Sequence, residues 1–427
     1  MTEEDRTHSP EFHLVILGGD IGVYALARSA FEAYGERSTV ISGAALGPIA
    51  RSSIIDVVAL GMGASVKDIA EKALEIAPNL QARYKGKELI LLTNSDSQVR
   101  AVIEMSDKLK EYYHLPMVDL KLLDMVQDKL SFAKLCEKYE VKTPKTVGVD
   151  LSSYNTDAWV KPKLPDEFPL VAKPANSAHY ERLRFEGMKK VYFISNQEEL
   201  DHLWKTLYEG GVRSHFVLQQ LIPGDDQCMQ SLTAYVDSNH KVTMFGSAQV
   251  LLEEHVPTAL GNPAAMITRP FEDLYGQAQA LLEGINYTGF ANFDVKKDPR
   301  DNTQYFLEVN PRIGRNNYYN TAAGLNPVEF LVRDIICHEE LDLQLISQEV
   351  LYTVLTTQLL KRYISKENKN AVSELVRAGR VVNPLWADYD KGLGIDTLKR
   401  RTWIVLHTLN HYKKFRRHYP KKTDSGF

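Results

Sequence analysis

The sequence has few cysteines, no long apolar run and no large charge imbalance. Its three cysteines, Cys136, Cys228 and Cys337, are far apart and show no spacing typical of a disulfide framework or a metal site. No stretch approaches the roughly 18 uninterrupted apolar residues of a membrane span. The acidic N-terminus lacks the basic region and apolar core of a signal peptide. We therefore expect a protein of the reducing cytoplasm.

Charge and composition exclude further classes. A formal net charge of −4 gives no general attraction to nucleic acid, so no nucleic-acid partner is expected. Apolar residues make up 44% and charged residues 25% of the chain, as in ordinary globular proteins. The 427 residues suffice for two or three domains.

The first part of the chain has the pattern of a doubly wound α/β domain. Residues 12–17 predict a buried strand, and a turn with three glycines, 18–22, leads into a helical stretch at 24–34. The glycines lack the full dinucleotide fingerprint, so close helix–strand packing or an organic-acid site is favoured over dinucleotide binding. Further strands are expected at 38–41, 57–60 and 88–93, and helices at 66–77 and 97–112.

The rest of the chain alternates short strands with helices. A helical pattern covers 120–147, Pro144 leads into a strand, and residues 151–168 have the composition of a connecting loop. Residues 230–237 and 241–251 predict an antiparallel hairpin. The other expected strands are 168–173, 191–194, 216–221, 291–296 and 305–310, and the other expected helices are 197–209, 271–284, 345–362 and 400–418.

The most informative stretch is 306–315, Phe-Leu-Glu-Val-Asn-Pro-Arg-Ile-Gly-Arg. Glu308 and Asn310 are two apart in a strand, which puts both side chains on one face. Carboxylate and amide oxygens are ligands suited to Mg²⁺ that also contacts phosphate oxygens. Arg312 and Arg315 follow directly as candidate anion binders. This pattern indicates a site for nucleotide phosphates and a second anion.

Asp294 lies on the preceding arm of the predicted hairpin, on the same face as Asn292 and Lys296. If the faces of the two arms coincide, Asp294 meets Glu308, and two adjacent carboxylates need a cation. Magnesium bridging ATP phosphates is the natural one. A solvated sheet face would explain Asp294 alone, but the whole set favours function.

Two lysines and a turn precede this cluster. Lys173 ends an apolar strand, where its ammonium group can contact a phosphate. Lys129 is a second candidate, with a surface role equally expected. Residues 219–226 predict a strand that breaks into a turn, whose backbone could read an adenine edge while Asp226 accepts a ribose hydroxyl. Alone, this turn would be an ordinary strand end.

In this order the parts resemble the ATP-grasp superfamily, and more specifically the D-aspartate ligases of Gram-positive bacteria. The resemblance covers about residues 12–335 and is carried by segments 17–24, 173–177, 222–226 and 287–294. It implies a mixed α/β and α+β fold. The implied parts are a Rossmann-like domain at 1–120, a two-lobed ATP-grasp domain at 121–335 with its small lobe at about 145–222, and a helical extension with a basic tail at 336–427.

The resemblance also implies ATP, one or two Mg²⁺ ions and a role for each candidate residue. Lys173 and Arg312 are the implied catalytic residues, and Arg312 would stabilise an acyl phosphate. The other implied contacts are Lys129 and Lys173 with the α- and β-phosphates, Gln219 and Ile222 with adenine, Asp226 with ribose, Asp294, Glu308 and Asn310 with Mg²⁺, and Arg269 and Arg315 with the amino acid. For Arg269, a surface role is equally expected.

One stretch departs from the superfamily pattern. Many members cover the γ-phosphate with a glycine-rich loop, whereas 177–190 contains only Gly187. Side chains in this loop are expected to replace the glycines, with 175–190 closing over the site. The candidates are Ser177, His179, Lys189 and Lys190, while Arg182 and Arg184 are candidates for solvated residues.

By resemblance, the reaction joins D-aspartate through its β-carboxylate to a lysine side chain of a UDP-linked or lipid-linked muropeptide precursor. The alternatives are a ligase for another amino acid or dipeptide, a carboxylase acting through carboxyphosphate, and a non-catalytic nucleotide-binding regulator. The basic stretch 400–422 could contact an anionic membrane, but a helix packed on the body is the favoured interpretation.

Overall fold

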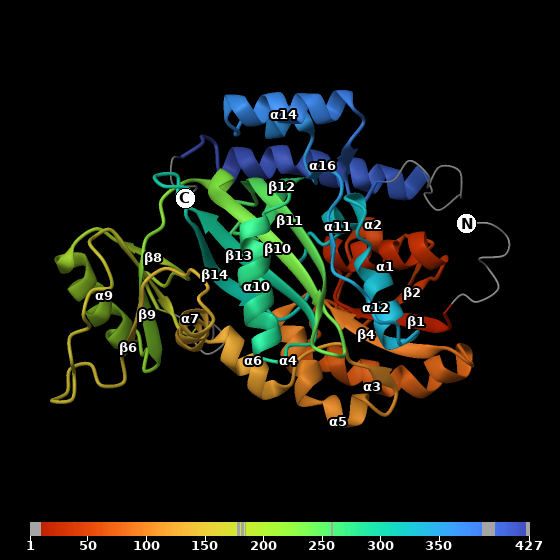
Figure 1. Ribbon diagram of the computed structural model, residues 1–427, viewed down its shortest axis with the longest axis horizontal. Coiled ribbons are helices and arrows are strands. Elements are labelled where there is room, and N and C mark those ends of the chain that lie inside the picture. The colour runs from red at the N-terminus through yellow and green to blue at the C-terminus, as the bar shows by residue number, and fades with distance from the viewer. Residues whose placement is uncertain are drawn as a thin grey trace.

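In the computed structural model, which describes residues 10–176, 180, 183, 185–257, 259–386 and 398–423, the described chain contains three β-sheets. Figure 1 shows them side by side, with the large sheet between the N-terminal sheet and the small one. The N-terminal sheet is formed by residues within 1–120, and the large sheet also takes in three short strands between 344 and 382, from the stretch expected to be a helical extension.

The N-terminal sheet is parallel, with strand order β3-β2-β1-β4-β5. Its central strand β1 (Phe12–Leu17) is buried along its whole length, as expected for a parallel strand covered on both faces. The helical stretch predicted at 97–112 is largely confirmed, but it is interrupted at Met105 into two helices and ends at Leu109. The other elements are β2 (Ser38–Ser42), β3 (Ile55–Ala59), β4 (Glu88–Thr93), β5 (Tyr113–His114), α1 (Ile21–Tyr34), α2 (Gly47–Ala50), α3 (Val66–Arg83), α4 (Asp96–Glu104) and α5 (Ser106–Leu109).

The small sheet has the order β6-β9-β7-β8 and is antiparallel. Helix α9 (Gln197–Glu209) begins after Asn196, whose side chain accepts a hydrogen bond from Glu199 N. Its buried apolar face, which includes Trp204, packs on one face of this sheet. The strands are β6 (Thr146–Asp150), β7 (Leu170–Pro174), β8 (Tyr192–Ile194) and β9 (His215–Gln220).

The helical pattern expected over 120–147 is interrupted. Asp128 has an extended backbone and its side chain caps a new helix, so the chain forms α6 (Leu120–Gln127) and α7 (Lys129–Lys138). The helix ends at Lys138, and the strand expected after Pro144 is β6, which begins at Thr146. The break places Lys129 at the first position of α7, where its backbone N–H donates to Ala175 O, just after β7.

The large sheet has the order β14-β13-β10-β11-β12-β16-β17, and β15 pairs with β11. Helix α10 (Glu272–Gly284) lies across one of its faces (Figure 1) and packs on an apolar core with Phe293 and Val295. The strands are β10 (Met229–Val236), β11 (Val242–Glu253), β12 (Pro263–Thr268), β13 (Gly289–Lys297), β14 (Gln304–Asn310), β15 (Gln344–Leu345), β16 (Leu351–Thr353) and β17 (Val381–Val382).

The predicted helix over 345–362 is wrong. Its apolar run Leu351–Thr353 is the buried strand β16, which pairs with β12, and the helical part is limited to α13 (Thr357–Leu360). A short apolar run is compatible with a buried strand as well as with a helix. Here the run forms a strand because it pairs with the edge of β12. The remaining helices are α11 (Tyr318–Ala322), α12 (Pro327–Ile335), α14 (Lys366–Arg377) and α16 (Leu398–His418).

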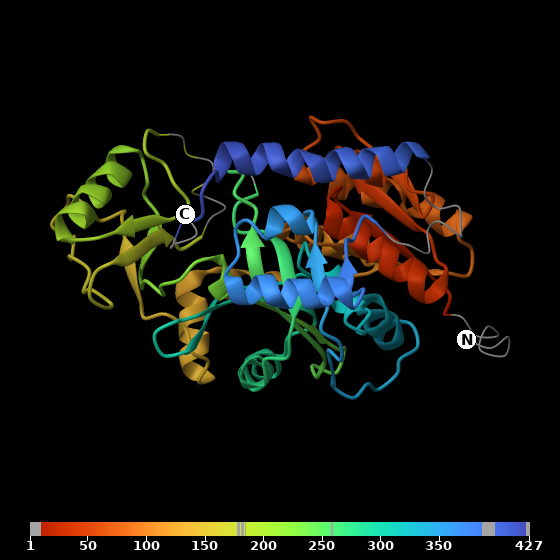
Figure 2. The same cartoon turned by 90° about the horizontal axis from the view of Figure 1, so that it is seen from above.

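The predicted final helix is α16, and it packs on the body as favoured. Figure 2 shows it along one side of the molecule, with the N-terminal domain beneath one end. A narrow stripe of Arg400, Ile404, His411 and Phe415 is buried, while the outer face is exposed. Among the described residues, no helix has the length and apolar character needed to span a bilayer.

Candidate active site

Strands β13 and β14 bring the predicted acidic cluster together. Their antiparallel register places Asp294 opposite Glu308 and Asn292 opposite Asn310, so the polar faces of the two arms coincide. Asn310 Nδ2 donates to Asp294 Oδ2 at 3.2 Å. After Asp294 the register shifts by a β-bulge, and Val295 then faces Phe306 in the core below.

Asn292 is fixed by the neighbouring strand β10. Its Oδ1 accepts hydrogen bonds from Thr233 Oγ1 at 2.9 Å and from Ser231 Oγ at 3.4 Å. Gly314 passes so close that an added Cβ would lie 2.6 Å from this oxygen. The polar floor of the site is therefore tightly packed, and the turn after β14 needs a residue without a side chain at this point.

The small sheet presents Lys173 toward this cluster. Lys173 pairs with Val217 and Gln219 with Val171, so both polar residues share one face, while Ala172 and Leu218 pack against α9 on the other. Lys129 lies nearby because its backbone bonds to Ala175. Two lysines thus face two carboxylates across the space between the lobes.

The charges of this cluster act on one another. Burial and the carboxylate of Glu308 raise the pKa of Asp294. Burial also acts to raise the pKa of Glu308, but the charges of Lys129 and Lys173 outweigh it and lower that pKa. Burial and the Lys129 charge lower the pKa of Lys173 to about 8, against the effects of Glu308 and Asp294. These shifts show that the four side chains share one electrostatic environment.

The residues fit a magnesium ion. No group of three or more His, Cys, Asp or Glu side chains that could hold a metal occurs within the described residues. The cluster has two such carboxylates, Asp294 and Glu308, and the amide of Asn310 would be the third oxygen donor to the ion. Two half-buried adjacent carboxylates with opposed pKa shifts are a donor set that a divalent cation would stabilise.

Both arginines after β14 contact the N-terminal domain. Arg312 Nη2 donates to Asp96 Oδ2 at 2.9 Å, and Arg315 Nε lies 3.4 Å from Asp20 Oδ2. Asp20 caps α1, and an added Cβ on Gly22 would lie 2.6 Å from Arg315 O. The glycine turn therefore allows close packing, which was favoured over dinucleotide binding. The segment that packs against the turn is the loop that carries Arg312 and Arg315.

The turn at 219–226 lies between the lobes. Gln219 Nε2 donates to Thr146 Oγ1 at 2.7 Å, and Ile222 is buried. Asp226 Oδ2 accepts hydrogen bonds from Glu253 N at 2.9 Å and His255 Nε2 at 3.0 Å. Both bonds use Oδ2, so Oδ1 of Asp226 remains for a further donor such as a ribose hydroxyl.

The structure does not bring Arg269 to this cluster. Its Nη1 donates to Gln249 Oε1 at 2.6 Å, and its Nε to Glu349 Oε1 at 3.0 Å at a partly exposed position. Gln249 pairs with Gln230, which pairs with Val295, so Arg269 contacts the sheet face opposite to that of Asp294. This position agrees with the surface alternative.

Part of the expected γ-phosphate loop lies outside the described residues, including Ser177, His179, Arg182 and Arg184. Lys189 and Lys190 are described and exposed. Lys189 N donates to Tyr192 OH at 2.9 Å. The γ-phosphate contacts of this loop stay a prediction.

Sequence reasoning missed four acidic residues around the site. Asp20 and Asp96 follow the carboxyl ends of β1 and β4, and that position in a parallel sheet was a usable signal. Glu253 and Glu254 end β11 and carried no local signal. Burial and the charges of Asp226 and Asp294 raise the pKa of Glu253 to about 8, which places it beside the nucleotide end of the cluster.

The three-part fold and the lysine–carboxylate–arginine cluster define an ATP-grasp ligase. Similar solved structures include the biotin carboxylase domain of 2-oxoglutarate carboxylase from Hydrogenobacter thermophilus, crystallised with MgADP and bicarbonate (TM-score 0.58, 14% identity, 81% of this chain and 74% of that chain). Another is N5-carboxyaminoimidazole synthetase from Staphylococcus aureus with ADP (TM-score 0.54, 17% identity, 85% and 87%). These likenesses confirm the predicted fold class.

The sequence comparisons narrow this class. No family model matches the chain. A curated D-aspartate ligase from Enterococcus faecium is 30% identical over 422 residues, which cover 96% of this chain and 98% of that protein. The chain belongs to the D-aspartate ligase family, as its motifs predicted.

Proposed function

We propose that the protein joins D-aspartate, through its β-carboxylate, to the lysine side chain of a peptidoglycan precursor at the expense of ATP. The name of the E. faecium relative supports both the ligation and the acid. A UDP-linked or lipid-linked muropeptide supplies the amine. We place the reaction in the cytoplasm, where ATP is available and where Cys136, Cys228 and Cys337, which are free cysteines, stay reduced.

One observation carries the proposal: the half-buried Asp294–Glu308 pair faces Lys129 of α7 and Lys173 of β7, with Arg312 beside it. A protein that only binds nucleotide needs affinity, but it does not need a carboxylate pair opposed by three cations. The arrangement suits a reaction in which negative charge moves between phosphate oxygens.

In the first step a carboxylate oxygen of the acid attacks the γ-phosphorus. The bond from this phosphorus to the bridging oxygen breaks, which gives ADP and an acyl phosphate. Lys129 and Lys173 bind the α- and β-phosphates and reduce repulsion between the anionic acid and the nucleotide. When bound to Asp294, Glu308 and Asn310, Mg²⁺ supplies further charge neutralisation on the phosphates.

In the second step the amine nitrogen attacks the acyl carbon, and the bond from this carbon to the phosphate oxygen breaks. Arg312 stabilises the departing phosphate, since its guanidinium can donate two parallel hydrogen bonds. Gln219 and Ile222 bind adenine, and Asp226 binds a ribose hydroxyl through Oδ1. Water must be excluded throughout, because an acyl phosphate hydrolyses.

A phosphate-release screen tests this function. Purified protein with ATP and Mg²⁺ is offered D- and L-amino acids, each with and without a lysine-containing muropeptide precursor. We expect release with D-aspartate, increased by the precursor. Release with a different acid would indicate a ligase for another amino acid. Nucleotide binding without acid-dependent release would indicate a non-catalytic regulator.

A further inference from the structure

The C-terminal extension, which begins at residue 336, holds the turn between the lobes. The first attachment is at Gln227, in the short 3-10 helix η2 (Asp226–Cys228) that follows this turn. Its Oε1 accepts hydrogen bonds from Ser365 N and from Asn368 Nδ2, both at 2.8 Å. Ser365 caps α14 and Asn368 lies in its first turn, so the extension contacts the turn between the lobes directly.

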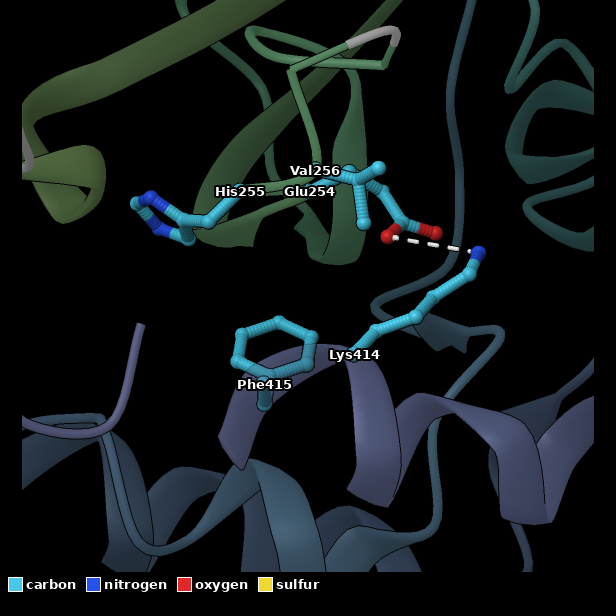
Figure 3. Close-up of a pocket in the computed structure, with 5 residues that line it drawn as sticks. All are labelled: Glu254, His255, Val256, Lys414 and Phe415. Carbon is cyan, nitrogen blue, oxygen red and sulfur yellow. Dashed lines mark ion pairs between the residues drawn. The ribbon is translucent and has the colours of Figure 1, made fainter. Parts of the chain in front are cut away.

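The second attachment reaches Asp226 through the ring of His255. His255 Nε2 donates to Asp226 Oδ2 at 3.0 Å. Tyr419, just beyond the end of α16, stacks on this imidazole with ring centroids 3.6 Å apart and planes 2° from parallel. Phe415 of α16 meets the same ring at 72°, with centroids 6.0 Å apart. Figure 3 shows Phe415 on α16 and the side chain of His255, which points away from the ion pair between Glu254 and Lys414.

These contacts are buried in the fold. Tyr419 is 5% exposed and His255 9%, which excludes a loose contact at the surface. Lys422 Nζ, further along the tail, lies 2.7 Å from Asp225 Oδ2. The tail therefore holds two neighbouring residues of the turn, Asp225 directly and Asp226 through the imidazole.

The bond from His255 decides how the Asp226 carboxylate is turned. Oδ2 is held by two donors, the backbone N of Glu253 and the ring of His255. With the backbone donor alone, the carboxylate could rotate and exchange its two oxygens. Because Tyr419 fixes the plane of the imidazole, the direction of its N–H is fixed as well, and Oδ1 stays turned away to accept another donor.

We propose that His255 and Tyr419 are positioning residues for the nucleotide: the tail of the chain holds the imidazole, and the imidazole orients Asp226 so that Oδ1 accepts a ribose hydroxyl. The selected ligand is a ribonucleoside triphosphate in preference to its deoxy form. The inference rests on the proposed function, which assigns the ribose to Asp226. It adds a part for the C-terminal extension in nucleotide selection, which the motif around Asp226 does not indicate.

The test compares the dissociation constants of ATP, 2′-deoxyATP and 3′-deoxyATP, measured by titration calorimetry with Mg²⁺ and without an acid. We expect the wild-type protein to bind ATP roughly tenfold or more tightly than at least one deoxynucleotide, because a bond from a hydroxyl to a carboxylate is charge-assisted. The ratio of two constants from one protein sample does not depend on the folded fraction. A variant of reduced stability therefore still gives a result.

Two matched pairs of variants separate orientation from packing. The amide of His255→Asn is too short to reach the position of Nε2, whereas that of His255→Gln can place an N–H there. Tyr419→Leu removes the stacked ring, and Tyr419→Phe keeps it. We expect the preference for ATP to fall roughly fivefold or more in His255→Asn and Tyr419→Leu, and to stay within about twofold of wild type in the other two. His418→Asn, exposed beside Tyr419, is the control and should bind as wild type does.

A wild-type preference in His255→Asn or in Tyr419→Leu would overturn the inference, and so would equal binding of all three nucleotides by the wild-type protein. Equal losses within either matched pair would also overturn it, because the hydrogen bond or the stacked ring would then not be the cause. Failure to release phosphate with any acid, in a protein that still discriminates between the nucleotides, would refute the proposed function alone.

Discussion

Asp294 and Glu308 lie directly opposite each other on adjacent antiparallel strands, in a register that leaves two half-buried carboxylates side by side. Burial and mutual repulsion raise the pKa of Asp294, while the lysines of the small lobe lower that of Glu308. Such a pair is unfavourable for folding unless a cation joins it. The presence of the pair, despite this cost to folding, is therefore explained if it forms part of a cation-binding site.

Glu308→Gln should abolish ADP formation and leave the fold intact. Removal of one carboxylate weakens the proposed magnesium site and leaves the positive charges of Lys129 and Lys173 less well compensated. We therefore expect kcat to fall at least about a hundredfold. The melting temperature should stay equal or rise, because repulsion with Asp294 is relieved. Acid-dependent ADP production and thermal unfolding measure both effects.

The control for this experiment is Asp301→Asn, an exposed carboxylate in the turn between the same two strands. It should retain activity. Full activity in Glu308→Gln would contradict the metal assignment of the pair.

ATP affinity should fall as the pH rises through about 8. Burial and the Lys129 charge lower the pKa of Lys173 to about 8, so its ammonium form predominates below that pH and is lost above it. Only the ammonium form attracts phosphate, and the affinity therefore decreases on the alkaline side. In Lys173→Arg the charge persists, so the decline between pH 8 and pH 9.5 should disappear. Dissociation constants of an ATP analogue, measured for the wild-type protein and Lys173→Arg across this range, test the prediction. Parallel curves for the two proteins would contradict a role of Lys173 in the pH dependence.

The hairpin chemistry was predictable because strand geometry has a period of two. Knowing that 305–310 is a strand is enough to put Glu308 and Asn310 on one face, and the observed register then brings Asp294 to the same face. Helix α9 was predicted at Gln197–Glu209, since its cap, Asn196, and its apolar spacing are local signals. Local patterns therefore account for much of the fold and for the residues of the acidic cluster.

What the sequence did not reveal depends on contacts between distant segments. Nothing near Arg312 indicates that Asp96 will pair with it, and nothing near Glu254 indicates His411. The strand Leu351–Thr353 was read as helix because only the open edge of β12 makes it a strand. The fold defines such relationships, and periodicity carries no information about them.

Asp96→Asn should impair catalysis more than nucleotide binding. Asp96 holds the guanidinium of Arg312 from the N-terminal domain at 2.9 Å, and its charge fixes the arginine beside the carboxylate pair. Asparagine keeps an acceptor but loses the charge. We expect kcat to fall roughly tenfold, the effect of about 1.4 kcal/mol on the barrier, with a smaller change in the KM for ATP. Steady-state kinetics separate the two quantities, and Asp107→Asn, exposed on α5, is the control. A roughly tenfold rise in the KM for ATP with unchanged kcat would instead assign Asp96 to nucleotide binding.

Two glycine-to-alanine changes should have opposite effects on stability. Gly276 is exposed in the middle of α10 with open space around its Cα, so Gly276→Ala should stabilise the protein by about 0.5–1 kcal/mol through lower backbone entropy of the unfolded chain. In Gly314→Ala the new Cβ would lie 2.6 Å from Asn292 Oδ1, which Thr233 and Ser231 already hold. We expect a loss of about 1–3 kcal/mol from overpacking, together with reduced ligase activity because Asn292 adjoins the metal cluster. Chemical denaturation of both variants, with activity measured on the same samples, tests the pair. A stabilised and fully active Gly314→Ala protein would show that the turn can move away from Asn292, and that the tight packing beneath the site is not required for its chemistry.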